Sequence, residues 1–211
     1  MKHDLTELVF ILDKSGSMAG LESDTIGGYN ALLDKQKKDP GSATVTTVLF
    51  DDDYELLHDR IDIKGVAPIT DKEYFVGGCT ALLDAIGRTI QKIGNAQKHT
   101  ADAERAARVL FVITTDGMEN ASREYSFEAI RLLIQRQKER YGWEFIFLGA
   151  NIHAIATAVR VGMFASRSVN YKGDGRGTPL NCAVICEVGG AFRGKQSIAK
   201  VWKRIIEEDE Q

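Results

Sequence analysis

The sequence predicts an α/β protein with three layers, α/β/α, doubly wound around a mostly parallel sheet that carries one antiparallel edge strand. Two patterns support this prediction. Short apolar runs alternate with longer amphipathic stretches, and one pair of runs is separated by only a few acidic residues. Short apolar runs are typical of strands buried on both faces, and amphipathic stretches are typical of helices. Their alternation indicates βαβ units with helices on both faces of the sheet.

Four apolar runs are rich in β-branched and aromatic residues and are flanked by polar residues or glycine. They are Leu8–Leu12, Val45–Phe50, Val109–Thr114 and Phe145–Leu148, and we expect them to be buried strands. The second run is followed by Asp51-Asp52-Asp53 and then by Tyr54–Ile63. An acidic turn this short has no room for a crossover helix. We therefore expect these two runs to form an antiparallel hairpin at a sheet edge.

Apolar residues spaced three and four positions apart mark the helices. The sets are Ile26, Tyr29 and Leu33; Leu83, Ile86, Ile90 and Ile93; Phe127, Ile130, Leu133 and Ile134; Ile152, Ile155 and Val159; and Ile198, Val201, Trp202 and Ile205. Each set forms an apolar stripe along one helix face. The sequence shows no linker or internal repeat, so we expect one domain over residues 1–211. Within it, residues 172–211 are the hardest to place, because glycines interrupt the pattern up to Gly194.

Composition and charge narrow the classes of function. The net charge is −3 and the sequence pI is about 5.9, whereas a nucleic-acid-binding domain is expected to be basic. No run approaches the ~20 apolar residues of a membrane span, so we expect neither nucleic acid nor membrane as a partner.

The cysteines are Cys79, Cys182 and Cys186. An odd number without an export signal indicates reduced thiols in the cytoplasm. The short, unadorned architecture is typical of prokaryotic proteins.

Polar residues follow two of the predicted strands and precede one predicted helix. Asp13, Ser15 and Ser17 come after the first strand, Asp116 follows the third, and Thr80 precedes the helix that we expect to open at Ala81. Because ligands bind beyond the carboxyl ends of parallel strands, we expect these side chains to converge at one edge of the sheet. Two carboxylates and three hydroxyls form an all-oxygen set. Such a set suits Mg²⁺ first, and then Mn²⁺ or Ca²⁺.

In type, order and approximate spacing, these residues resemble the metal-ion-dependent adhesion site (MIDAS) of von Willebrand factor A (VWA) and integrin I domains. That site combines D-x-S-x-S, a Thr, and an Asp usually followed by Gly. Here it corresponds to Asp13-Lys14-Ser15-Gly16-Ser17, Thr80 and Asp116-Gly117. The resemblance covers roughly Leu5 to Tyr171. It implies a Rossmann-like VWA fold of the small prokaryotic single-domain type.

The resemblance also implies roles for the individual residues. Ser15 and Ser17 would bind the metal directly, and Asp13, Thr80 and Asp116 would bind it directly or through water. One coordination position would stay open for a carboxylate of a partner. We therefore expect a metal-dependent protein-binding module, with Mg²⁺ as the cofactor, an Asp or Glu of a partner protein as the ligand, and no enzymatic activity.

Two other functions remain open at this point. The first is a Mg²⁺-dependent phosphoryl-transfer hydrolase with Asp13 or Asp116 as nucleophile. Arg123 is the nearest residue to Asp116 that could hold phosphoryl oxygens. The second is a non-catalytic subunit of an AAA-type ATPase or a stress-response complex, as bacterial relatives of the family often are.

Structural alternatives also remain open for single residues. Thr80 could be a helix N-cap, Asp116 a turn residue, and Glu119 could fold back to fill the sixth position of the metal. The segment from Gly189 to Lys195 resembles a P-loop, but Gln196 stands where that motif needs Ser or Thr. We expect a glycine loop there, followed by a helix over Ser197–Glu208.

Overall fold

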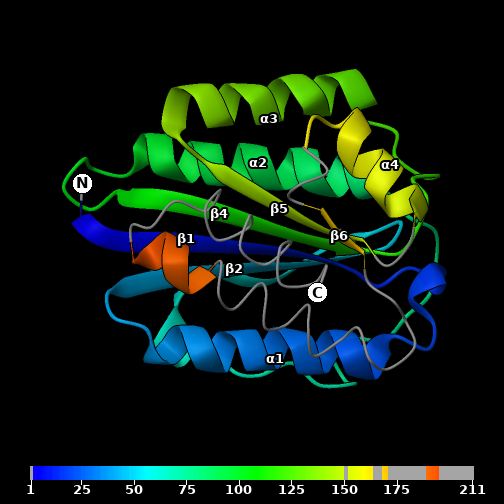
Figure 1. Cartoon of the computed structure of the whole chain (residues 1–211), viewed down its shortest axis with the longest axis horizontal. Helices are drawn as coiled ribbons and strands as arrows, with labels where there is room; N and C mark the ends of the chain where they lie inside the picture. The colour runs from blue at the N-terminus through cyan, green and yellow to red at the C-terminus, as the bar shows by residue number, and fades with distance from the viewer. Residues whose placement is uncertain (1, 150–151, 164–167, 171–188, 195–211) are drawn as a thin grey trace, which may run out of the picture.

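A computed structural model describes residues 2–149, 152–163, 168–170 and 189–194, in which helices cover both faces of one sheet (Figure 1). In chain order the elements are β1 (Lys2–Asp13), the 3₁₀ helix η1 (Gly16–Met18), α1 (Glu22–Lys38), β2 (Ser42–Phe50), β3 (Tyr54–Asp62), the 3₁₀ helix η2 (Ile63–Gly65), α2 (Leu82–His99), β4 (Ala106–Thr115), α3 (Phe127–Tyr141), β5 (Glu144–Gly149), α4 (Ile152–Arg160) and β6 (Ser168–Asn170). No helix in these described ranges is long and apolar enough to span a membrane.

The described strands form a six-stranded sheet in the order β3-β2-β1-β4-β5-β6. Each neighbouring pair is parallel except β2 and β3, which form the predicted antiparallel hairpin with β3 at the edge. The chain winds outward from β1 to β2 and β3, then crosses back and continues on the other side of β1 with β4. The predicted three-layer, doubly wound fold is therefore confirmed. The junction of β1 and β4 is its topological switch point.

Each face of the sheet has its own hydrophobic core. Along β1, Leu8, Phe10 and Leu12 belong to the core that α1 covers. Val9 and Ile11 alternate with them and belong to the core beneath α2 and α3. Successive side chains of a strand point to opposite faces, so the middle of a strand covered on both sides is apolar at consecutive positions. Figure 1 shows α1 on one side of the sheet and α2, α3 and α4 on the other.

The predicted helices up to residue 160 are confirmed, but the expected glycine loop after residue 188 is wrong in its first part. Residues 189–193 are helical. Ala191 and Phe192 join the core on the α1 side. The buried Arg193 side chain donates to the carbonyl oxygens of Asp39, Pro40 and Gly41, just past the end of α1, at 3.2, 3.1 and 2.8 Å.

Tertiary contacts of this kind override the weak helix propensity of glycine. The predicted helix over Ser197–Glu208 lies outside the described residues, and so do Cys182 and Cys186.

Candidate metal centre

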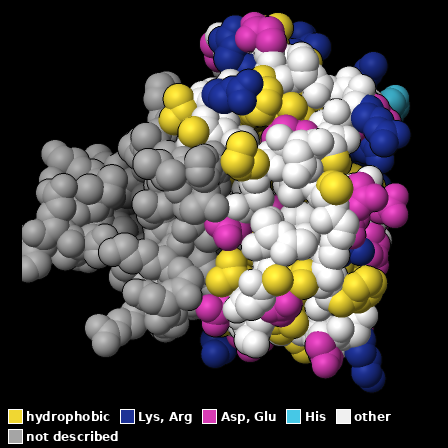
Figure 2. Space-filling view, turned by 90° about the vertical axis from the view of Figure 1, so that its right-hand side faces the viewer, with side chains coloured by type: hydrophobic (Ala, Val, Ile, Leu, Met, Phe, Trp, Pro, Cys, Tyr) yellow, Lys and Arg dark blue, Asp and Glu magenta, His cyan; other side chains and the backbone are white. Residues whose placement is uncertain are grey.

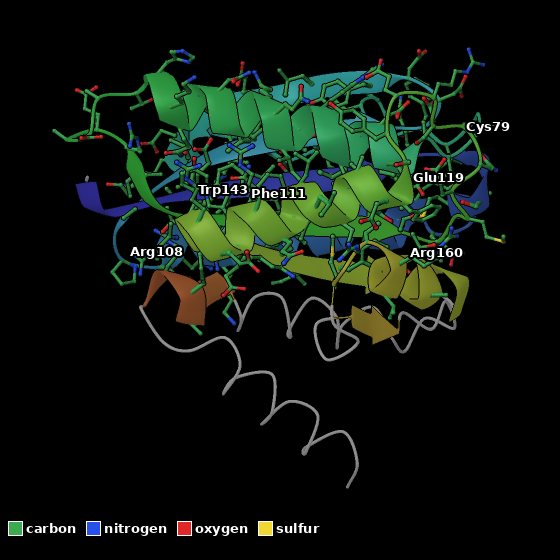
Figure 3. The ribbon with its side chains drawn as sticks, turned by 90° about the horizontal axis from the view of Figure 1, so that it is seen from above. Cys79, Arg108, Phe111, Glu119, Trp143 and Arg160 are labelled. Atoms are coloured by element: carbon green, nitrogen blue, oxygen red, sulfur yellow. The ribbon has the colours of Figure 1, made fainter. Side chains whose placement is uncertain are left out.

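The three loops that carry the predicted metal ligands lie together where β1 and β4 end. The Gly16 N–H donates to the Gly78 carbonyl at 3.1 Å, and the Gly77 N–H donates to the Lys14 carbonyl at 2.8 Å. In Figure 3, Cys79 and Glu119 lie at this end of the sheet and Arg108 lies at the other. The predicted convergence of these loops is therefore present.

Gly117 brings the third loop against the other two. A Cβ added at Gly117 would lie 2.5 Å from Thr80 Oγ1 and 2.8 Å from Ser17 Oγ. Atoms this close would have to move, so the approach depends on the absence of a side chain. Asp116 is half-buried. It stands directly between the end of β4 and this contact.

The three predicted hydroxyls form one hydrogen-bonded group. Ser15 Oγ lies 2.9 Å from Ser17 Oγ, and Thr80 Oγ1 donates to Ser15 Oγ at 2.9 Å. Ser15 and Thr80 are buried, but Ser17 is exposed, so the group opens to solvent on its Ser17 side. Thr80 is not the N-cap of α2, because Ala81 holds that position. We call Ser15, Ser17 and Thr80 the hydroxyl group.

Asp13 is fully buried beneath the hydroxyl group. One carboxylate oxygen accepts from the Ser15 N–H at 2.7 Å, and the other accepts from Thr115 Oγ1 at 2.5 Å. Tyr74 donates its hydroxyl to the Asp13 carbonyl oxygen. Burial raises the pKa of Asp13, and the hydrogen bonds from Thr115 and Ser15 act against that rise. A cation nearby would favour the charged carboxylate.

The donor set fits a hard divalent cation. It offers oxygen atoms from Asp13, Ser15, Ser17, Thr80 and Asp116 and no nitrogen or sulfur, which is the chemistry that Mg²⁺ and Mn²⁺ prefer. Within the described part of the chain, no group of three or more His, Cys, Asp or Glu residues could hold a metal ion. Metal binding at this site would therefore depend on the hydroxyl oxygens as well as on the two carboxylates.

Three residues that the sequence did not single out support this geometry. Besides Thr115 and Tyr74, Asn120 holds the Thr80 loop. The Thr80 N–H donates to Asn120 Oδ1 at 2.9 Å, and the Asn120 N–H donates to the Thr80 carbonyl at 3.1 Å. Thr115 and Asn120 lie close to Asp116 in the sequence, and this nearness is the only sequence feature that could have pointed to their role. No sequence feature points to Tyr74, because it reaches Asp13 from a distant loop.

Glu119, the rival for the sixth metal position, caps α2 in this structure. Its carboxylate accepts from the N–H groups of Leu83, Ala121 and Ser122 at 3.0, 3.1 and 2.8 Å, and from Ser122 Oγ at 2.8 Å. A carboxylate at a helix N-terminus is also stabilised by the helix dipole. These four donors occupy both carboxylate oxygens of Glu119.

The cationic side chains near the site point to other roles. Lys14 lies inside the motif, but its Nζ contacts Glu55 at 3.1 Å and Asp51 at 3.7 Å. These contacts lie away from Ser15 and Ser17, as expected where successive side chains of an extended segment point to opposite sides. Arg123 is exposed, and its backbone N–H donates to Asp84 at 2.8 Å.

Comparisons with known proteins identify the fold. No family model matches the chain, and no curated protein sequence matches it. Among solved structures, it is similar to a von Willebrand factor type A protein from Catenulispora acidiphila, with a TM-score of 0.58 and 15% identity over 95% of this chain and 43% of that one. It is also similar to the manganese-loaded TRAP protein of Plasmodium vivax, with a TM-score of 0.60 and 18% identity over 81% and 70%.

A third neighbour is proximal thread matrix protein 1 from the mussel byssus, with a zinc-occupied MIDAS motif. Its TM-score is 0.54 and its identity is 15%, over 87% of this chain and 46% of that one. The chain therefore has the VWA-like, Rossmann-like fold that the motif predicts. It spans 70% of the TRAP chain but less than half the length of the other two neighbours.

Proposed function

We propose that this protein is a metal-dependent protein-binding module. A divalent cation, Mg²⁺ in the cell, is held by Asp13, Ser15, Ser17, Thr80 and Asp116. The cation keeps one coordination position open and binds there a carboxylate of an Asp or Glu on a partner protein. Asp13 and Asp116 balance the charge of a divalent ion and the hydroxyls add none, so the ion stays receptive to an anionic ligand.

The observation that carries this proposal is the solvent-facing hydroxyl group at the topological switch point. Ser15 Oγ lies 2.9 Å from both Ser17 Oγ and Thr80 Oγ1, and Ser17 is exposed. An ion bound on the Ser17 side would be reachable by another protein. The neighbour structures support a divalent metal in general, since one is manganese-loaded and one has zinc in its MIDAS motif. The all-oxygen donor set favours Mg²⁺ over Zn²⁺.

We further propose that the protein is not an enzyme. Phosphoryl transfer commonly needs a cation to stabilise the phosphoryl oxygens, and Lys14 instead contacts Glu55 and Asp51. The test is a phosphoester panel with Mg²⁺, comparing the protein with Asp13→Ala. Turnover that disappears in the variant would establish the hydrolase instead.

The partner is a protein rather than a nucleic acid or a membrane in this proposal, in keeping with the acidic composition. A role as a subunit beside an AAA-type ATPase or in a stress-response complex is one form of the same binding function.

We place the protein in the cytoplasm. Cys79 is a free thiol among the described residues, which suits a reducing compartment.

The test of the proposed function joins metal to partner binding. Metal analysis of protein purified without chelator should find one Mg²⁺ or Mn²⁺ per chain, or a site that takes one up. A pull-down from native lysate should recover a partner in Mg²⁺ and lose it in EDTA. Recovery that is identical with Mg²⁺ and with EDTA would overturn the proposal, as would tight zinc with no response to Mg²⁺ or Mn²⁺.

A further inference from the structure

Two exposed apolar side chains stand on the loops that build the candidate metal centre. Six large hydrophobic side chains are exposed among the described residues, and two of them are Phe75 (60% exposed) and Met118 (59%). Phe75 lies two residues before Gly77, whose N–H donates to the Lys14 carbonyl. Met118 directly follows Gly117. Figure 2 faces the end of the molecule where the parallel strands terminate, and hydrophobic side chains are visible on it among polar and acidic ones.

Phe75 is held in place in spite of its exposure. The Lys14 ammonium lies 4.8 Å from the centre of the Phe75 ring, a cation–π contact. Lys14 is itself 6% exposed and is fixed by Glu55 and Asp51. Met118 stands beside Gly117, whose Cα lies against Thr80 and Ser17. Lys14 therefore holds Phe75 on one of the site loops, and Met118 directly follows the Gly117 that lies against the hydroxyl group.

Acidic residues border the same loops. The carboxylate of Asp52 accepts from the Cys79 N–H at 3.1 Å, and Asp52 and Asp53 are exposed. These carboxylates would repel additional acidic groups on a partner that approaches past Cys79. The rim of the site is thus apolar at Phe75 and Met118 and negative at Asp52 and Asp53.

We propose that Phe75 and Met118 select the partner segment. They favour a single acidic residue flanked by apolar side chains and disfavour an acidic tract. The partner carboxylate binds the metal, and its apolar neighbours cover Phe75 and Met118. This inference rests on the proposed function, because it needs a metal that binds a carboxylate.

The experiment uses the full chain with Mn²⁺ and three short capped peptides, each with a central Glu flanked on both sides by Ala, by Leu or by Glu. Binding is measured by calorimetry, and Mn²⁺ affinity is measured separately. The Leu-flanked peptide should bind about tenfold more tightly than the Ala-flanked one, since burial of a few tens of Å² of apolar surface contributes on that scale. The Glu-flanked peptide should bind less tightly than the Ala-flanked one.

Variants then test the two residues. Phe75→Ser and Met118→Ser should each remove most of the preference for Leu and leave Mn²⁺ affinity unchanged. Leu132→Ser is the matched control, because Leu132 is 53% exposed on α3 and is not part of the site loops. This variant should keep the full preference.

The outcomes separate the two proposals. If no peptide binds in Mn²⁺, the proposed function fails. If all three bind equally, or if Leu132→Ser lowers the preference as much as Phe75→Ser does, the carboxylate site stands and the selecting role of Phe75 and Met118 is wrong.

Discussion

Gly117 shows how much of this site depends on one residue without a side chain. The loop after β4 reaches Ser17 and Thr80 at distances that leave no space for a methyl group. We expect Gly117→Ala to push these hydroxyls apart and to weaken Mn²⁺ binding at least tenfold. Calorimetry with Mn²⁺ measures this loss.

The matched control for that substitution is Gly27→Ala. Gly27 lies within α1, and an added Cβ there would have no neighbour within 4 Å. Because alanine stabilises a helix interior by roughly 0.5–1 kcal/mol relative to glycine, this variant should unfold at higher urea concentration. Its Mn²⁺ affinity should equal that of the natural protein. Normal Mn²⁺ binding by Gly117→Ala would show that the ion does not use the hydroxyl group.

Ser17 gives the second prediction at this scale. Ser17→Ala removes one hydroxyl oxygen from an exposed position, so we expect clear loss of metal affinity. The free energy of unfolding in the absence of metal should change by about 1 kcal/mol or less. Urea unfolding in EDTA and metal titration measure the two quantities. A variant that unfolds easily and still binds metal would make Ser17 a structural residue.

The sequence predicted the candidate ligands because their spacing is local and their order follows the strands. Asp13, Ser15 and Ser17 alternate along one loop, and Asp116-Gly117 follows a recognisable strand. The hydrogen bonds from Thr115 and Tyr74 to Asp13 were not predictable in the same way. They span distant parts of the chain, and a single sequence contains no measure of which distant polar groups meet.

At the scale of the secondary-structure elements, two carboxylates fix the loop from Glu119 to Tyr125 to α2. Glu119 accepts from Leu83 and from its own loop. Asp84 accepts from the N–H groups of residues 123–125 at 2.8 to 3.0 Å. This loop begins two residues after Gly117, so its attachment to α2 also positions the third side of the candidate metal centre.

We therefore predict that Glu119→Gln changes stability and not metal stoichiometry. An amide has one oxygen acceptor where the carboxylate has two, so hydrogen bonds to the Glu119 side chain are lost, at a cost of roughly 1–3 kcal/mol in the free energy of unfolding. One Mn²⁺ per chain should still bind. Asp116→Asn is the contrasting variant and should lose most of its Mn²⁺ affinity. Loss of Mn²⁺ binding by Glu119→Gln at unchanged stability would make Glu119 a ligand.

Helices and strands were predictable where each element carries its own pattern. The hairpin of β2 and β3 followed from an acidic turn too short for a crossover. The helix over residues 189–193 was missed because its reasons are tertiary. Phe192 packs into the core, and Arg193 donates to carbonyls just past the end of α1. Neither fact is visible in a segment that begins with two glycines.

At the scale of the whole molecule, a buried ionic network ties β1, β3 and α2 together. Glu7 is fully buried in β1. Its carboxylate accepts from Arg60 Nε of β3 at 2.8 Å and from Gln97 Nε2 of α2 at 2.5 Å. Burial raises the pKa of Glu7, and Arg60 and Gln97 act against that rise.

The direction of this pKa shift predicts a pH dependence. A carboxyl whose folded-state pKa is raised contributes stability that is complete below its ordinary pKa of 4.5 and is lost as the pH rises through the folded-state value. Glu7→Gln has no such titration. Its stability relative to the natural protein should therefore increase between about pH 4 and about pH 7.

Urea unfolding of both proteins at the two pH values measures this difference, because the remaining titrating groups are common to both. If the stability of Glu7→Gln relative to the natural protein falls as the pH rises, Arg60 holds the pKa of Glu7 below its ordinary value. In that case the ion pair would outweigh the cost of burial.

The architecture as a whole was predictable because the apolar patterns agree with one another. Strands with continuous apolar runs require cover on both faces, and the alternating helices provide it. The identity of a binding partner lies outside such patterns. It depends on surface side chains such as Phe75 and Met118, which no periodicity marks.

The outer edge formed by β3 has a consequence for how the protein behaves at high concentration. An unpaired strand edge is a template for other strands, and charged residues or bulges on it oppose that pairing. β3 carries Glu55, Asp59, Arg60 and Asp62. Its register with β2 shifts twice, and Arg60 adopts a left-handed backbone conformation with a φ of 51°. A second copy that approaches this edge meets charge and an irregular backbone, and both features oppose edge-to-edge pairing.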